Sequence, residues 1–184
     1  MDGSRIEYEY MEPKEEALRA LLRELFETHW SEITFGPCIQ GAVYEIRLTE
    51  PPRKLSMLDG YLTVDAGTWH FHLCIGDHRG PPANPVPEAL ARRRRAAKAA
   101  FFRQGGGTNV KGSWGFRMWN GNEEQMLTIF FPNPYLDEQM NTKPQPDWNR
   151  LGLWNRLRLK HLPGASEWGS TEGGLAGGNP GERK

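Results

Sequence analysis

Three side chains that can bind a metal or move a proton occur at alternate positions of one short segment: His70, His72 and Cys74. Imidazole nitrogens and thiolates are ligands of zinc, iron and copper in proteins. Alternate residues of a β-strand point to the same side of a sheet, so this spacing predicts one shared ligand face. Trp69 and Phe71 alternate with them and would hold the other face of the strand in the core.

Strand geometry limits how many of these side chains can bind one ion. Neighbouring same-face positions lie about 7 Å apart, and the first and third about 13 Å apart, at roughly 3.3 Å per residue. We therefore expect a pair, His70 with His72 or His72 with Cys74, that a remote group completes. The side chains available to complete it are Cys38, as a second thiolate, His29 and His78. The sequence thus predicts a small metal-binding protein for zinc, iron or copper, and a catalytic role and a carrier role both fit.

Two other interpretations of the same residues stay open. Histidine and free cysteine also occur in ordinary sheets, where packing and hydrogen bonding explain them. A metal-free enzyme would use Cys74 or Cys38 as the nucleophile and His72 or His70 as the base. Same-face neighbours on a strand need not touch, and no nucleophile elbow or oxyanion loop accompanies them. The sequence therefore assigns no catalytic residue and no reaction.

A metal-free binding function centres on Arg117 and Asn120. Arg117 alternates with apolar residues of a predicted strand over 114–119, so it points away from their face. If its face also carried His70 and His72, a cation and two imidazoles would line one cavity. This pattern predicts a binding module for a small anionic or aromatic ligand, with Arg117 and Asn120 among the ligand-binding residues.

The arginine run Arg92–Arg95 is the one concentration of positive charge. The chain has 23 Lys and Arg against 23 Asp and Glu, so it has no overall attraction to nucleic acid. Four consecutive helical residues point in four directions and form no flat patch. An interaction domain that binds nucleic acid or protein through this helix is a third alternative, and a solvated helix face is the simpler interpretation.

Hydrophobic periodicity predicts an α+β fold in the order α-βββ-α-ββ-α. Mixed hairpins without a repeated βαβ unit favour a mainly antiparallel five-stranded sheet with about three helices packed on it. We expect a single domain over 1–165 and a disordered, Gly-rich tail over 166–184. The expected elements are helices at 12–30, 87–103 and 148–162, and strands at 42–49, 61–65, 68–75, 114–119 and 125–131.

Composition indicates a soluble cytoplasmic protein. Two cysteines are too few for a disulfide framework, and the acidic N-terminal segment does not have the character of a signal peptide. No stretch approaches the roughly 20 apolar residues that a membrane-spanning helix needs. We expect no membrane partner.

Three segments resemble an uncharacterised bacterial protein family. Together they cover about the middle third of the chain, and the resemblance implies no activity and no residue role. The segments are Trp69-His70-Phe71-His72-Leu73-Cys74-Ile75-Gly76, Ser113-Trp114-Gly115-Phe116-Arg117 with Asn120-Gly121, and Phe131-Pro132-Asn133-Pro134-Tyr135-Leu136.

Overall fold

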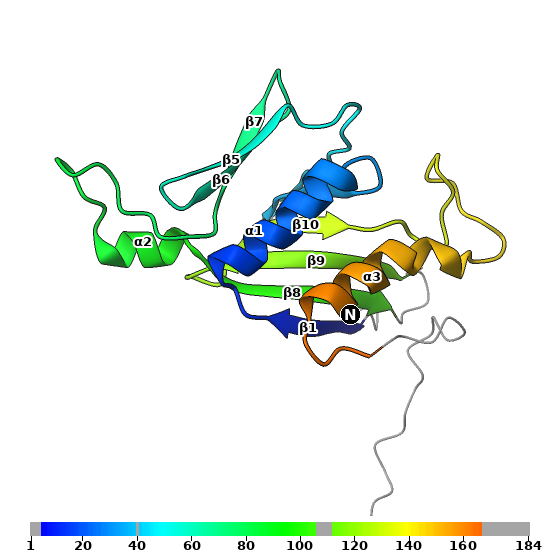
Figure 1. The fold of residues 1–184 in the computed structure, drawn as a ribbon. Coiled ribbons are helices and arrows are strands. Elements are labelled where there is room, and N and C mark those ends of the chain that lie inside the picture. Colours follow the sequence, from blue (N-terminus) through cyan, green and yellow to red (C-terminus); the bar gives the residue numbers. More distant parts are fainter. Residues whose placement is uncertain (1–4, 40, 106–111, 167–184) are drawn as a thin grey trace, which may run out of the picture.

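A computed structural model describes residues 5–39, 41–105 and 112–166. The expected tail, from residue 167 onward, lies outside these residues, and the domain bounds stay a prediction. The largest element is a five-stranded sheet in the order β1-β8-β9-β10-β2, in which all neighbours are antiparallel (Figure 1). Its strands are β1 (Arg5–Met11), β8 (Ala96–Gly105), β9 (Ser113–Asn120), β10 (Gln125–Phe130) and β2 (Thr34–Gly36).

Two smaller sheets complete the strand content. A three-stranded antiparallel sheet has the order β5-β6-β7, and a short hairpin joins β3 to β4. These strands are β5 (Lys54–Leu58), β6 (Tyr61–Asp65), β7 (His70–Cys74), β3 (Cys38–Ile39) and β4 (Ala42–Val43). The helices are α1 (Glu15–Arg23), which continues as the π-helix η1 (Glu24–Thr28), α2 (Glu88–Arg94), the 3-10 helix η2 (Trp148–Leu151) and α3 (Gly152–His161). The predicted α+β class with a five-stranded antiparallel sheet is confirmed.

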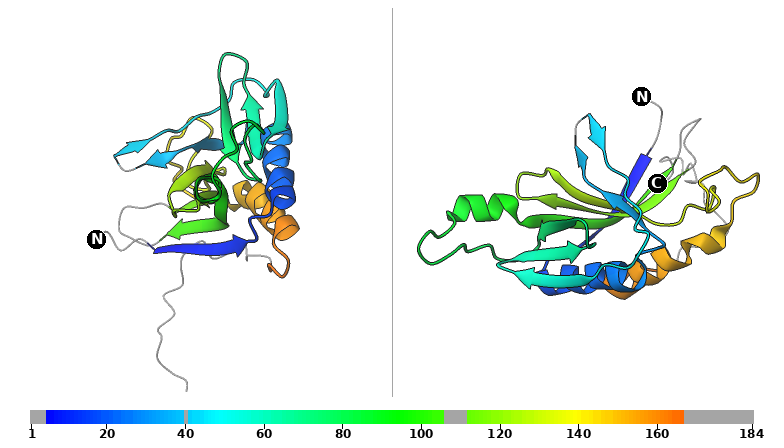
Figure 2. Two further views of the ribbon diagram at one scale, coloured as in Figure 1. Left: turned by 90° about the vertical axis from the view of Figure 1, so that its left-hand side faces the viewer. Right: turned by 90° about the horizontal axis from the view of Figure 1, so that it is seen from above.

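Helices α1 and α3 lie on one face of the five-stranded sheet, and the β3–β4 hairpin projects on the other side (Figure 2). The leucines of α1 and η1 recur at intervals of three and four and are fully buried, as the periodicity of 12–30 predicts: Leu18, Leu21, Leu22 and Leu25. The apolar face of the three-stranded sheet joins the same core. Phe71 of β7 packs against Phe26 and Phe35, with ring centres 5.5 Å away in both cases.

The predicted helix 87–103 is wrong beyond Arg94, because Ala96–Gly105 forms the central strand β8. Alanine favours helices, but the four consecutive residues Ala99–Phe102 are all buried. A strand covered on both faces buries every residue, whereas an amphipathic helix buries one stripe. The strand predicted over 42–49 is also shorter, since only β4 and an isolated bridge from Ile46 to Phe35 form. Strands β1, β2, β3 and β5 are additional to the predicted order.

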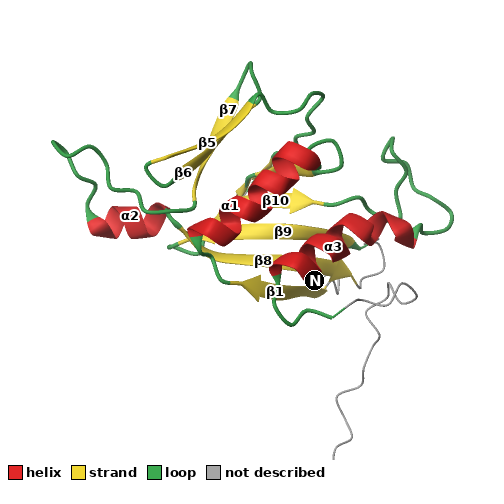
Figure 3. Cartoon of the chain, in the orientation of Figure 1, coloured by secondary structure: helices red, strands yellow, loops and turns green. Residues whose placement is uncertain are grey.

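A long irregular segment, residues 131–147, connects β10 to η2 (Figure 3). Pro132 cannot donate a backbone hydrogen bond, so it ends the pairing of β10. The Asn133 side chain then fixes the turn, because its Oδ1 accepts from Tyr135 N at 2.9 Å and its Nδ2 donates to Gly112 O at 2.7 Å. No helix within the described ranges is long and apolar enough to cross a membrane.

Candidate functional site

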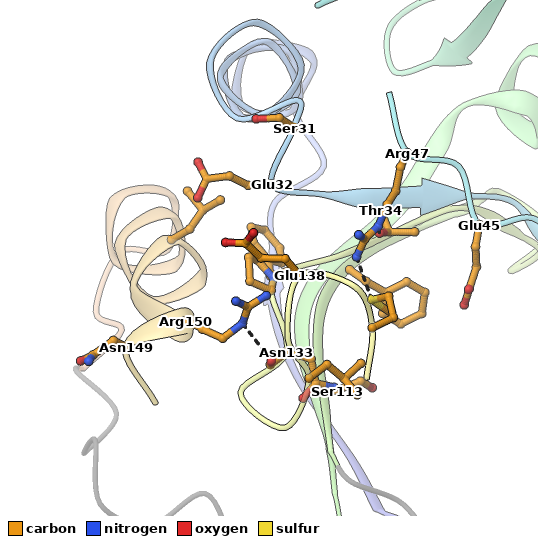
Figure 4. Close-up of a pocket in the computed structure, with 16 residues that line it drawn as sticks. Ser31, Glu32, Thr34, Glu45, Arg47, Ser113, Asn133, Glu138, Asn149 and Arg150 are labelled. Carbon is orange, nitrogen blue, oxygen red and sulfur yellow. Dashed lines mark hydrogen bonds between the residues drawn. The ribbon is translucent and has the colours of Figure 1, made fainter. Parts of the chain in front are cut away.

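A pocket of about 650 Å³ opens at the end of the five-stranded sheet where β10 ends and β2 begins (Figure 4). Its walls come from the turn after η1, from β2, from the segment after β4, from the irregular segment 131–147 and from the start of α3. The apolar part consists of Phe130, Phe131, Pro132, Leu136, Met140 and Leu153. Phe131 and Leu153 are only 4% and 5% exposed, so the pocket rests directly on the hydrophobic core.

Two arginines enter the pocket from opposite sides (Figure 4). Arg47 donates from Nε to Thr34 Oγ1 at 2.8 Å and from Nη2 to Met140 Sδ at 2.9 Å. Arg150 donates from Nε to the backbone oxygen of Asn133 at 3.1 Å. Neither guanidinium forms an ion pair with a carboxylate of the described residues. Both side chains are therefore positioned through neutral acceptors.

Three glutamates share the rim of the pocket: Glu32, Glu45 and Glu138. Glu32 is engaged with His29, whose Nδ1 lies 2.7 Å from its Oε1. In Figure 4, Glu45 lies far from Arg150, beyond Thr34 and Arg47. Glu138 is exposed and lies on the irregular segment 131–147. The rim therefore carries both signs of charge above an apolar floor, which is how a small amphipathic ligand is recognised.

Helix η2 sets the position of Arg150. Asp147 caps this helix, and its carboxylate accepts from the backbone N–H of Asn149 at 3.3 Å. Asp147 also accepts from Lys143 Nζ at 3.3 Å, which ties the cap to the irregular segment. The cap fixes where the first turn begins, and Arg150 follows within that turn.

The predicted metal ligands His70 and His72 are adjacent on the open face of the three-stranded sheet. Both are exposed, and their ring centres are 5.0 Å apart at 71°. Across the sheet, Asp65 pairs with His70 and Thr63 pairs with His72. Thr63 Oγ1 and His72 Nδ1 are 2.7 Å apart and hydrogen bonded. The alternation therefore brings two imidazoles together, as the strand spacing predicts for a pair.

Cys74 lies farther along the same strand in a different environment. It is only 3% exposed, and its Sγ lies 3.7 Å from Gly76 O. Burial raises the pKa of the Cys74 thiol, and the nearby Tyr61 hydroxyl and Arg95 only partly offset this effect. Because the thiolate is the reactive and metal-binding form, this environment disfavours both roles at neutral pH. Cys74 as a ligand stays a prediction.

The remote groups named to complete the site are dispersed. Cys38 belongs to β3, which is outside the three-stranded sheet, and its role stays a prediction. His29 is bonded to Glu32 at the pocket, and His78 lies 3.5 Å from Asp59 and packs on Tyr61. Over the described ranges, no group of three or more His, Cys, Asp or Glu side chains gathers as metal ligands would.

Arg117 and Asn120 are both on β9 of the five-stranded sheet, so Arg117 shares no face with the histidines. Arg117 donates to Thr128 Oγ1 at 3.0 Å and to Tyr8 Oη at 2.7 Å. Asn120 closes the hairpin turn, where its Oδ1 accepts from two backbone N–H groups, of Asn122 and Glu124. That role explains Asn120 without a ligand, and its ligand role stays a prediction.

The arginine run ends α2, which has no buried residue. Arg92 pairs with Glu88 at 2.6 Å and Arg95 with Asp77 at 2.6 Å. These exposed pairs agree with the solvated helix face that the sequence favours.

The sequence interpretation did not single out Arg47 and Arg150. Arg47 stood within the predicted strand 42–49, and Arg150 within the first turn of the predicted helix 148–162. The available signal was the Phe131–Leu136 segment, whose proline and asparagine residues indicate a fixed turn. Such turns commonly carry binding residues on a rigid scaffold.

The fold and the pocket together define an α+β protein with an amphipathic cavity at one end of an antiparallel sheet. The sequence matches DUF7676, a family of unknown function, over residues 1–163, so the chain belongs to this family. This match agrees with the resemblance to an uncharacterised family. No curated protein matches the chain.

One solved structure with a similar fold is the crystal structure of ChuX. The two chains are 12% identical with a TM-score of 0.51, over 88% of this chain and 78% of that chain. At this identity the likeness shows a shared fold alone.

Proposed function

We propose that the protein binds a small amphipathic organic anion in the pocket between Arg47 and Arg150. One observation carries the proposal: an apolar floor of core side chains lies beneath two guanidinium groups that form no salt bridge with the described carboxylates. The pocket volume of about 650 Å³ falls within the range of small-molecule sites. This interpretation keeps the anionic or aromatic ligand predicted from the sequence and proposes a different part of the molecule for it.

The chemistry of the two walls defines the ligand. Burying an apolar body against Phe130 and Leu136, which are half-buried without a ligand, removes hydrocarbon surface from water. A carboxylate or sulfonate would accept hydrogen bonds from the terminal nitrogens of Arg150, whose Nε is already held by Asn133. Because the Asn133 contact orients the guanidinium beforehand, binding would cost little additional side-chain entropy.

Calorimetric titration with three compounds that share one ring tests the proposal: indole-3-acetate, tryptamine and tryptophan. We expect indole-3-acetate to bind most tightly, because it alone of the three compounds carries a carboxylate without an ammonium group. Arg47→Met and Arg150→Met should each weaken its affinity about 10- to 100-fold, the effect of losing a charge-assisted hydrogen bond. Arg156→Met is the matched control, since Arg156 is an exposed arginine of α3 that does not line the pocket.

Glu138→Gln tests the sign of the interaction. Removing a rim carboxylate should strengthen the binding of indole-3-acetate by a few fold, because like charge disfavours the anion. Equal or tighter binding of tryptamine, or weaker anion binding after Glu138→Gln, would contradict an anionic ligand.

Metal binding at His70 and His72 is the second candidate function. An ion bonded to two imidazoles at about 2.0–2.1 Å in tetrahedral geometry holds the ring centres roughly 5 Å apart. The spacing of 5.0 Å between these rings therefore supports a shared ion. If His72 donates from Nδ1 to Thr63 Oγ1, its Nε2 lone pair is free for the metal, which is a common arrangement of metal-binding histidines. Water would fill the remaining positions of a zinc or copper ion.

Titration of the untagged protein with copper(II) or zinc tests this site. We expect one equivalent to bind, and His70→Ala or His72→Ala to abolish it. Thr63→Val should weaken it about 10-fold by releasing the imidazole. His29→Gln is the control, because it removes a histidine elsewhere in the chain. Equal metal uptake by the wild type and both alanine variants would exclude the pair.

A further inference from the structure

The face of the five-stranded sheet opposite α1 and α3 carries a group of aromatic rings around Arg117. Tyr8 and Tyr10 of β1 lie near Trp119 of β9, with ring centres 5.4 Å and 6.4 Å from it. The two tyrosine rings are 5.9 Å apart. Tyr10 is 61% exposed, so this aromatic group, Tyr8, Tyr10 and Trp119, presents ring surface to solvent.

Arg117 is held rigidly within this aromatic group. Its guanidinium carbon lies 4.6 Å from the ring centre of Phe102 and 5.9 Å from that of Tyr8. Its Nε and Nη1 donate to Thr128 and Tyr8, and neither acceptor is charged. Across the described chain, no carboxylate pairs with Arg117. The second terminal nitrogen therefore keeps its hydrogen-bonding capacity and its share of the charge.

The register of the strands explains the position of the Arg117 side chain. In the sheet, Tyr10, Ala100, Arg117 and Thr128 are direct cross-strand neighbours. Ala100 separates the tyrosine from the arginine with the smallest apolar side chain, which leaves room above it for the neighbouring rings. Arg117 and Tyr10 thus stand on either side of a short residue, and both can contact one flat molecule.

We propose that this aromatic face is a second binding site, distinct from the pocket, for a planar aromatic anion. The ring of the ligand stacks on Tyr10 and Trp119, and its carboxylate accepts a hydrogen bond from Arg117. Each contact uses a group that the fold leaves unused: exposed ring surface and an unpaired guanidinium nitrogen. The proposal is independent of the pocket, because none of its residues lines the pocket.

Titration of the ¹⁵N-labelled chain with 2-naphthoate, observed by NMR at the Trp119 indole N–H, tests the site. We expect a saturable shift of this signal, which Trp119→Phe identifies by its loss. Tyr10→Ser should weaken the binding roughly 5- to 100-fold, the range for removal of one stacking partner. Tyr44→Ser is the matched control, because Tyr44 is 56% exposed and is not one of the rings of the aromatic group. Arg150→Met should leave the shift unchanged, which separates this site from the pocket.

Three outcomes would overturn the proposal. The first is no shift of the Trp119 signal at millimolar 2-naphthoate, and the second is an equal effect of Tyr10→Ser and Tyr44→Ser. The third is a stable dimer in light scattering that Tyr10→Ser dissociates, since the face would then bind a second copy of the chain.

Arg117→Met should lower the affinity for 2-naphthoate more than that for uncharged 2-naphthamide, an effect that a merely structural role would not produce.

Discussion

The pocket and the histidine pair lie on two sheets that are built differently. The five-stranded sheet has helices on one face and the β3–β4 hairpin on the other side (Figure 2), and its strand β8 is buried from Ala99 to Phe102. The three-stranded sheet is buried on one face only. On that face the side chains of Leu62 and Val64 are at most 1% exposed, while His70 and His72 are exposed on the opposite face.

This difference separates two kinds of site. The pocket floor consists of side chains that also hold the fold together, so its shape is fixed and its residues are costly to change. The histidine pair stands outside the core, so its residues can change without loss of stability. The affinity of this pair for a metal ion would then come from the coordination bonds alone.

The largest expected effect is on the stability of the pocket floor. Phe131→Ala removes a ring that is 4% exposed and packs near Phe101, and should lower the free energy of unfolding by about 3–5 kcal/mol. Phe71→Ala removes a half-buried ring from the buried face of the three-stranded sheet and should cost less. Urea denaturation of both variants measures the difference. Equal losses would mean that the two sheets contribute equally to the core, which would break the comparison.

A smaller effect is expected at Gly115, within the five-stranded sheet. A Cβ added there would lie 2.2 Å from Phe102 Cε1 and 2.7 Å from Ile129 O. Gly115→Ala should therefore destabilise the protein by about 1–3 kcal/mol through overpacking. Gly152→Ala is the control, since a Cβ at Gly152 meets nothing within 4 Å. Urea midpoints that fall equally in both variants would show that crowding is not the cause.

Strands β6 and β7 of the three-stranded sheet could be predicted from the sequence, because one face of their sheet is buried and the other is not, whereas β5 was not predicted. In such strands burial alternates with position, and Phe71 and Leu73 against His70 and His72 show the alternation clearly. Strand β8 could not be predicted in this way, because burial on both faces removes the alternation. Its alanines then favour a helix, and the segment forms a strand because it pairs with β1 and β9.

Strand β1 shows a second limit. Its acidic residues indicate a solvated segment, yet Glu9 lies 2.9 Å from Arg158, which is fully buried. Glu7 likewise pairs with Arg103 at 2.6 Å. Charge on a strand is thus compatible with the core when a distant arginine neutralises it. The pocket escaped prediction for a related reason, because Arg47 and Arg150 come from distant parts of the chain and meet only through packing.

A further prediction concerns the pH dependence of the helices beside the pocket. Burial raises the pKa of the Glu24 carboxyl, but hydrogen bonds from Lys160 and His161 of α3 outweigh it and hold this pKa below 4.5. Because the folded pKa is lowered, the stabilisation is present at neutral pH and is lost as the pH falls through the folded pKa. Glu24→Gln should cost about 1 kcal/mol at pH 7 and less near pH 3. Thermal unfolding at both pH values measures this, and a cost that is undiminished in acid would exclude the ion pairs as its source.

The smallest expected effect is at the histidine pair, where the comparison predicts almost no change in stability. His72→Ala removes an exposed imidazole whose one side-chain hydrogen bond, to Thr63, is replaceable by water. The metal-free protein should therefore unfold within about 0.5 kcal/mol of the wild type. With copper(II) or zinc present, the wild type should gain stability by mass action and the variant should not. A large loss of stability in the metal-free variant would show that these histidines stabilise the fold. The distinction between a pocket built on the core and a histidine pair outside it would then be wrong.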